Sequence, residues 1–194
     1  ELGVLAREGQ LPASPEVALQ RLAELATYTE ATYPDVTAVG VDTAAYHEAG
    51  ATAAQDIALG VATGVTYLRA LLDAQMPIDQ AARQMLFSFC VGTHHFLAIA
   101  KLRAARQVWW RVIQASGGSS AGGAMRLHVR TSQRVLTQRD PYVNLLRNTV
   151  GMFAAGIAGA ESMTSVPFDA MAREPGEFSR RVARNTLLIL QEEA

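Results

Sequence analysis

Four short apolar segments alternate with longer segments of helical periodicity, and this order constrains the fold more than any other feature. The short segments are residues 36–41, 86–91, 126–132 and 161–166. They alternate apolar with small or polar residues, or are almost wholly apolar, as strands do. Strands separated by long helices pair in parallel through right-handed crossovers. The sequence therefore predicts an α/β fold with four strand–helix units.

The segments between the strands carry the stripes of amphipathic helices. In residues 52–73 the apolar stripe runs through Ile57, Val61, Val65 and Leu68, at the spacing of one helix face. Residues 94–114 and 178–189 have the same period, and Asp140-Pro141 is predicted to cap a helix that extends to about residue 157. Another helix is predicted to precede the first strand, because Ser14-Pro15 is a favourable N-cap and first helical position.

Four units are half of a (β/α)8 barrel, a fold that typically needs about 250 residues. We expect one partial barrel domain over residues 1–194, with a leading segment and helix at 1–35 and four strand–helix units at 36–194. The outer strands of a half barrel would expose unpaired backbone edges flanked by apolar side chains. The chain is therefore expected to associate with a missing barrel half, with another chain, or with itself through these edges.

Composition excludes several classes of partner. The 17 basic and 18 acidic residues give a net charge of −1, so a nucleic acid partner is not implied. Cys90 is the only cysteine, which excludes an internal disulfide. The longest small-apolar run, residues 151–160, is shorter than the roughly 20 residues of a membrane span, and no signal-peptide pattern is present. These features predict a soluble cytoplasmic protein.

Several phrases of the chain resemble one protein family in the same order. They are Glu48-Ala49-Gly50-Ala51, residues 99–106 (IAKLRAAR), residues 126–132 (RLHVRTS), residues 136–149 (LTQRDPYVNLLRNT) and residues 178–186 (FSRRVARNT) running on to Gln191-Glu192-Glu193. Together they resemble the acyl-CoA-binding barrel of the adenosylcobalamin-dependent methylmalonyl-CoA mutases, from about residue 36 to the C-terminus. The resemblance implies that the chain matches the second half of the family's eight-unit barrel.

The loop after the first strand departs from the catalytic members of that family. Their phrase is Tyr-His, two residues, and then Glu-Ala-Gly-Ala, with the His approaching the substrate thioester. Counted back without gaps, the two places hold Ala44 and Ala45, which cannot donate a hydrogen bond. Tyr46-His47 follows two residues later, so His47 is the candidate for a catalytic acid if a two-residue gap is allowed. Its other interpretation is a partly exposed loop histidine.

This departure resembles the small, non-catalytic subunit of heterodimeric mutases. The N-terminal phrase at residues 2–9 (LGVLAREG) and the later Val166-Pro167-Phe168-Asp169 also look closer to that subunit.

The third predicted strand carries candidate substrate-binding residues. Arg126, His128 and Arg130 share one face, because strand side chains alternate. In the barrel lumen they would form a cationic lining for the phosphates or carboxylate of a CoA ester; facing the helices, they would need buried partners. Thr131 and Ser132 could give hydroxyls to the same ligand. The resemblance favours the lumen.

The resemblance also assigns candidate cofactor-binding residues. Glu48, Glu161 and Glu192 fall where active members place polar groups near the cobalamin; alternatively, Glu48 and Glu192 are a helix N-terminal charge and a solvated helix end. The family's cobalt-binding signature, Asp-x-His-x-x-Gly, is absent from the chain. Adenosylcobalamin is therefore expected in the holoenzyme and not on this chain alone.

No metal site is predicted. His94 and His95 are neighbours on a predicted helix and point about 100° apart, so they cannot easily share one ion. Cys90 lies in an apolar run without a nearby base in the sequence and is interpreted as a small core residue.

Three functions remain open. The first is a part of a methylmalonyl-CoA mutase, as its non-catalytic small subunit, inactive alone and a structural partner of the catalytic chain. The second is a fragment of a catalytic acyl-CoA mutase with a variant substrate pocket, in which His47 takes the acid role. The third is a free-standing acyl-CoA binding module.

Overall fold

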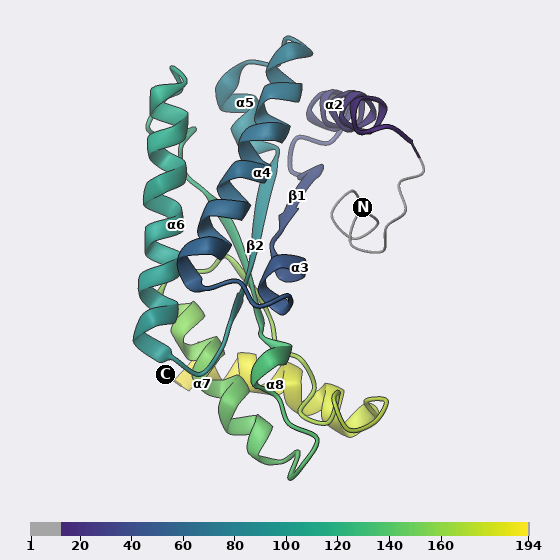
Figure 1. Cartoon of the computed structure of the whole chain (residues 1–194), viewed down its shortest axis with the longest axis vertical. Helices are drawn as coiled ribbons and strands as arrows, with labels where there is room; N and C mark the ends of the chain where they lie inside the picture. Colours follow the sequence, from purple (N-terminus) through teal and green to yellow (C-terminus); the bar gives the residue numbers. More distant parts are fainter. Residues whose placement is uncertain (1–12, 194) are drawn as a thin grey trace.

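A computed structural model describes residues 13–193 (Figure 1). The predicted N-terminal phrase at residues 2–9 lies outside the described residues. The helices are α2 (Pro15–Thr32), α3 (Ala44–Glu48), α4 (Ala53–Asp73), α5 (Ile78–Arg83), α6 (His95–Ala115), α7 (Val143–Ile157) and α8 (Glu177–Glu193), with a 3-10 turn at Gln133–Val135. The strands are β1 (Val39–Asp42), β2 (Met85–Val91), β3 (Arg126–Thr131) and β4 (Ser162–Thr164).

The four strands form one parallel sheet in the order β1-β2-β3-β4. This confirms the predicted α/β fold, and the arrangement is that of half a TIM-type barrel. Within residues 13–193, β1 pairs only with β2 and β4 only with β3. Each outer strand therefore keeps one unpaired backbone edge, as expected for a barrel that is open at two places.

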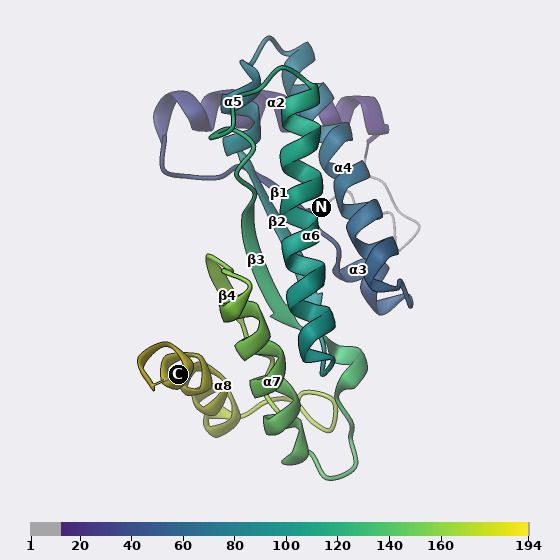
Figure 2. The same ribbon diagram turned by 90° about the vertical axis from the view of Figure 1, so that its left-hand side faces the viewer.

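One face of the sheet packs against α4, α6 and α7, which lie side by side along it (Figure 2). Phe87, Leu127 and Val129 point to this face and are fully buried. The Phe87 ring meets Trp109 of α6 with 4.7 Å between ring centroids. Gly64 lets α4 approach closely, since a Cβ there would lie 2.7 Å from the Phe87 ring. This layer is the hydrophobic core.

The opposite face is polar. The strand register aligns Asp42, Ser88, His128 and Ser162 in one row across all four strands, and their side chains are exposed or half-buried. We call this the open face. At the edge of β1 the expected apolar side chains are not exposed, because Val39 and Val41 are buried under the helices.

Local structure differs from prediction in five places. Asp140 does not cap a helix: it has a φ of 51°, and α7 begins at Val143 with Tyr142 as N-cap. The first strand begins at Val39 rather than residue 36, and the fourth spans only Ser162–Thr164. The short helices α3 and α5 were not predicted, because five or six residues are too few to show a period.

Among the described residues, no helix combines the length and the apolar character needed to cross a membrane.

Candidate functional site

Polar side chains gather where β1, β2 and β3 end. The loops that follow these strands enclose a cavity of about 350 Å³, which we call the strand-end cavity. Its wall includes His47, Cys90, Lys101, Ser132 and Arg134. Catalytic groups of parallel barrels lie at this end of the strands, so this is the place to test the predicted site.

His47 is buried at this end of the sheet, with 6% of its surface exposed. It lies in α3, the single helical turn that follows β1. Its Nε2 is 2.7 Å from Ser132 Oγ, and its Nδ1 is 3.5 Å from Asp56 Oδ2. The interpretation of His47 as a partly exposed loop histidine is therefore wrong: both ring nitrogens have protein partners under the loops.

Asp56 and Lys101 form a buried ion pair behind His47. The Asp56 side chain is 0% exposed and that of Lys101 5%, and the ammonium also donates to the Cys90 carbonyl at 2.8 Å. Burial raises the pKa of Asp56, but the hydrogen bond with His47 and the charge of Lys101 outweigh it and hold the pKa below its usual value. Asp56 is thus a carboxylate at neutral pH. Through Lys101 and His47, it links α4 to α6 and to α3.

Thr131 and Ser132 are buried, and their hydroxyls form hydrogen bonds with the loops around them. The Thr131 hydroxyl accepts the Val166 backbone N–H at 2.8 Å. Ser132 Oγ pairs with His47 and accepts the Arg134 N–H at 3.2 Å. Both hydroxyls, predicted to contact substrate, therefore already have partners in the protein.

Arg126, His128 and Arg130 lie on the open face, on one side of β3 as the alternation predicts. The alternative that they point at the helices is wrong, because Leu127 and Val129 occupy that side. His128 Nδ1 is 2.8 Å from Ser162 Oγ, and Arg130 is 3.9 Å from Asp42. Burial, and then the charge of Arg130, lower the pKa of His128, so this imidazole is neutral at pH 7.

Two of the three candidate cofactor residues, Glu48 and Glu161, lie at opposite ends of β3. Glu48 accepts the Gln133 N–H just beyond the carboxyl end of β3. Glu161 accepts the Leu127 N–H at 2.7 Å and pairs with Arg106, at the amino end of the same strand. Glu192 is exposed in the last turn of α8, and its neighbour Gln191 lines a cavity with Glu161. Cobalamin binding by these three carboxylates stays a prediction.

One group at this end was missed by the sequence analysis. Cys90 is buried, but it lies on the open-face side of β2 and outside the hydrophobic core. Ligand atoms of His47, Glu48 and Cys90 lie within 4.8 Å of one another. Burial raises the pKa of the Cys90 thiol to about 12. The position of Cys90 near the end of a predicted strand could have placed it at this site. Its closeness to α3 could not be predicted, because that contact forms only in the folded protein.

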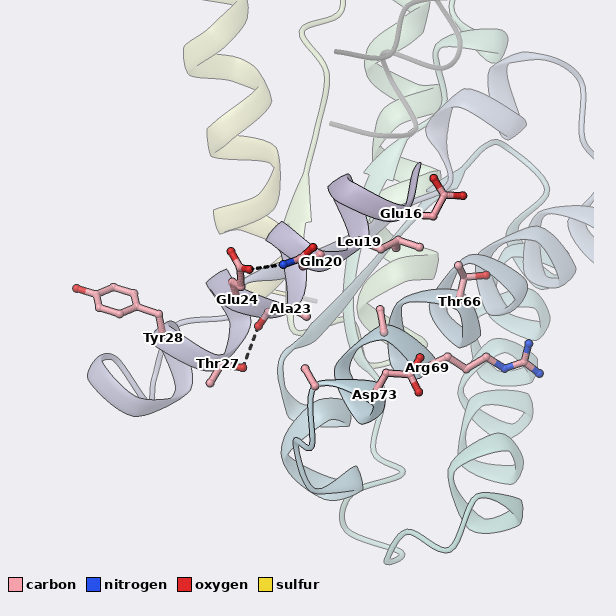
Figure 3. Close-up of a pocket in the computed structure, with 12 residues that line it drawn as sticks. Glu16, Leu19, Gln20, Ala23, Glu24, Thr27, Tyr28, Thr66, Arg69 and Asp73 are labelled. Atoms are coloured by element: carbon pink, nitrogen blue, oxygen red, sulfur yellow. Dashed lines mark hydrogen bonds between the residues drawn. The ribbon is translucent and has the colours of Figure 1, made fainter. Parts of the chain in front are cut away.

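A larger hollow than the strand-end cavity lies elsewhere. A groove of about 910 Å³ runs between α2 and α4, with Glu16, Glu24 and Asp73 along its sides (Figure 3). Its α4 residues, 66–74, lie at the other end of that helix from Asp56. The groove is thus separate from the strand-end cavity and contains none of the predicted site residues.

Comparison with characterised proteins identifies close relatives. The chain is 47% identical over 193 residues to the methylmalonyl-CoA mutase small subunit of Streptomyces virginiae, covering all of this chain and 30% of that protein. It is 43% identical over 162 residues to the probable small subunit of Mycobacterium tuberculosis, covering 81% and 26%. The methylmalonyl-CoA mutase large subunit of Porphyromonas gingivalis is 34% identical over 180 residues, covering 92% and 25%.

The chain thus spans under a third of the length of these relatives. The family model for methylmalonyl-CoA mutase matches residues 1–194. Together with the half-barrel sheet and the strand-end site, these matches show that the chain belongs to the methylmalonyl-CoA mutase family.

Proposed function

We propose that the chain is part of the small subunit of a methylmalonyl-CoA mutase and that its role is structural. It completes a barrel with the residues of its own subunit and partners a catalytic chain. The holoenzyme would interconvert methylmalonyl-CoA and succinyl-CoA, with adenosylcobalamin supplying the radical chemistry. The higher identity to small subunits, 47% against 34% for the large subunit, supports this choice.

The loop after β1 carries the proposal. Ala44 and Ala45 occupy the two places where the family resemblance puts Tyr-His, and both begin α3. A methyl group cannot donate a hydrogen bond to a thioester oxygen. His47, the only candidate replacement, is held by Ser132 and Asp56 below the loop. A catalytic fragment that uses His47 as its acid is therefore not favoured.

The open face supports a second role, contact with an acyl-CoA ester. Arg126 and Arg130 flank His128 there, and Arg130 lies 3.9 Å from Asp42. Guanidinium groups at such spacing suit phosphate or carboxylate oxygens. We propose these three residues, with Thr131 and Ser132 as their support, as the place where such an ester would touch this chain. Binding by a free-standing module remains the weaker alternative.

We further propose that residues 1–194 form a single partial-barrel domain of a cytoplasmic heterodimer. The unpaired edges of β1 and β4 are where the rest of the barrel would pair. The same edges would allow self-association of the isolated piece.

The experiment is reconstitution of the full-length protein with a catalytic mutase chain. We expect a complex of one copy of each, with one cobalamin and one active site per pair of chains, and no turnover by the full-length protein alone. Cobalamin absorbance per complex, analytical ultracentrifugation and the conversion of methylmalonyl-CoA measure these quantities. Two cobalamins per pair, or turnover without the catalytic chain, would overturn the structural role.

A further inference from the structure

We propose that His47, Glu48 and Cys90 bind a divalent transition-metal ion of the Zn²⁺ class at the carboxyl end of the sheet. One ligand atom from each residue lies within 4.8 Å of the other two. His47 and Glu48 are consecutive in α3, and Cys90 comes from β2. The site lies at the end of the barrel where the catalytic histidine of the family is missing. Metal binding there would be a property that the proposed structural role does not require.

The donor set matches zinc. Thiolate sulfur, imidazole nitrogen and carboxylate oxygen are its usual ligands, and sites with three protein ligands leave the fourth position to water or another ligand. His47 and Cys90 both line the strand-end cavity, whose volume of about 350 Å³ has room for that fourth ligand. Glu48 is half-buried, and only one of its carboxylate oxygens accepts the Gln133 N–H.

The groups behind His47 fit a metal ligand. A ligating histidine usually donates its other ring N–H to a carboxylate, which fixes the ring. Nδ1 lies 3.5 Å from Asp56, whose carboxylate also pairs with the ammonium of Lys101. The guanidinium of Arg134 is also 3.5 Å from Nδ1, but it only donates, so it must give up this contact when Nδ1 carries the proton. We therefore assign Nε2 as the metal ligand, which requires the ring to exchange the Ser132 hydroxyl for the ion.

The charges balance when the ion is bound. Cys90 loses its proton to solvent as the sulfur–metal bond forms, as metal-bound thiols do. The thiolate and the Glu48 carboxylate then offset the two positive charges of the ion. Two nearby cations are paired with carboxylates, Lys101 with Asp56 and Arg130 with Asp42, and the guanidinium of Arg134 remains beside His47. A neutral site of this kind is compatible with burial.

The test is a titration of the metal-free, cobalamin-free, full-length protein with Co²⁺, followed by displacement with Zn²⁺. We expect a cobalt–thiolate charge-transfer absorption that saturates at one ion per chain and disappears on adding Zn²⁺. Cys90→Ser should abolish this absorption. Glu48→Gln should retain it while weakening cobalt affinity at least about tenfold, since one ligand is lost.

His94→Gln is the matched control, because His94 lines the same cavity but lies outside the three-residue group; its spectrum and affinity should equal the parent's. Cys90→Ser changes one atom, and circular dichroism establishes that it is folded. An unchanged cobalt spectrum in Cys90→Ser, or no thiolate absorption in the parent protein, would overturn the metal site. Neither result bears on the structural role, which the subunit reconstitution tests separately.

Discussion

Replacing Lys101 with methionine should lower the free energy of unfolding by about 3–5 kcal/mol, because it leaves the Asp56 carboxylate buried without its ion-pair partner. Asp56 is completely buried and Lys101 almost so, which makes this pair sensitive to the loss of either member. The methionine stem fills most of the volume of the lysine, so the lost charge dominates the effect. Urea unfolding of the full-length protein measures it, through the transition midpoint at unchanged slope.

The matched control is Arg83→Met. Arg83 pairs with Glu30 at 3.2 Å, but its side chain is 57% exposed, so we expect a loss below about 1 kcal/mol. The double variant Lys101→Met/Asp56→Leu should recover most of the stability, because an apolar pair of similar volume removes the stranded charge. Equal losses in Lys101→Met and Arg83→Met would show that the pair is not buried as described.

The pH dependence of this effect has a defined sign. The pKa of Asp56 is lower in the folded protein than in the unfolded chain. Its contribution to stability is therefore present above the unfolded pKa, about 4, and is lost as the pH falls through the folded value. In Lys101→Met, the loss of unfolding free energy between neutral and acidic pH should be smaller, because a charge that lowers the pKa of Asp56 is gone.

Replacing Trp109 with alanine should cost about 3–5 kcal/mol of unfolding free energy. The indole is completely buried between α4 and the sheet and packs on Phe87 at 4.7 Å between ring centroids. A Cβ on Gly64 would lie 3.1 Å from the same indole, so there is no room for a larger residue between this ring and α4. The cavity left by alanine cannot collapse, since the surrounding groups belong to three different elements of the core.

The adjacent Trp110 provides the control. It is half-buried at the surface of α6, near the loop that contains Gly123. Trp110→Ala should cost roughly 1 kcal/mol or less. Urea unfolding followed by circular dichroism compares the two variants without relying on tryptophan fluorescence. Similar losses in both would contradict the assignment of Trp109 to the core and Trp110 to the surface.

Much of the fold follows from periodicity. The alternation in β3 correctly separated Arg126, His128 and Arg130 from Leu127 and Val129, because a strand admits only two faces. The stripe of α4 was readable only in part, because Ile57, Val61 and Val65 are half-buried. The buried face is centred on Asp56, Gly60 and Gly64, whose polar or absent side chains give no apolar signal. Asp140 shows the limit: Asp-Pro suits a helix start and a turn alike, and here the backbone takes the turn.

The site was less predictable, because the residues that come together depend on which end of the sheet each of them occupies. The family resemblance named Glu48 and Glu161 together, yet they bind backbone N–H groups at opposite ends of β3. Conversely, Cys90 and His47 are 43 positions apart and meet only through parallel pairing of β1 with β2. A pattern within one segment cannot report that contact.

The central claim is that His47 holds the loop rather than reacting. The variant His47→Gln keeps a hydrogen-bonding side chain for Ser132 while removing the imidazole. The decisive measurement is kcat for methylmalonyl-CoA in the complex of a catalytic chain with the full-length protein carrying His47→Gln. We expect the same kcat per complex as in the parent, because the catalytic chain holds the one active site. A fall to about half, the share of a second active site that uses His47 as its general acid, would contradict the account.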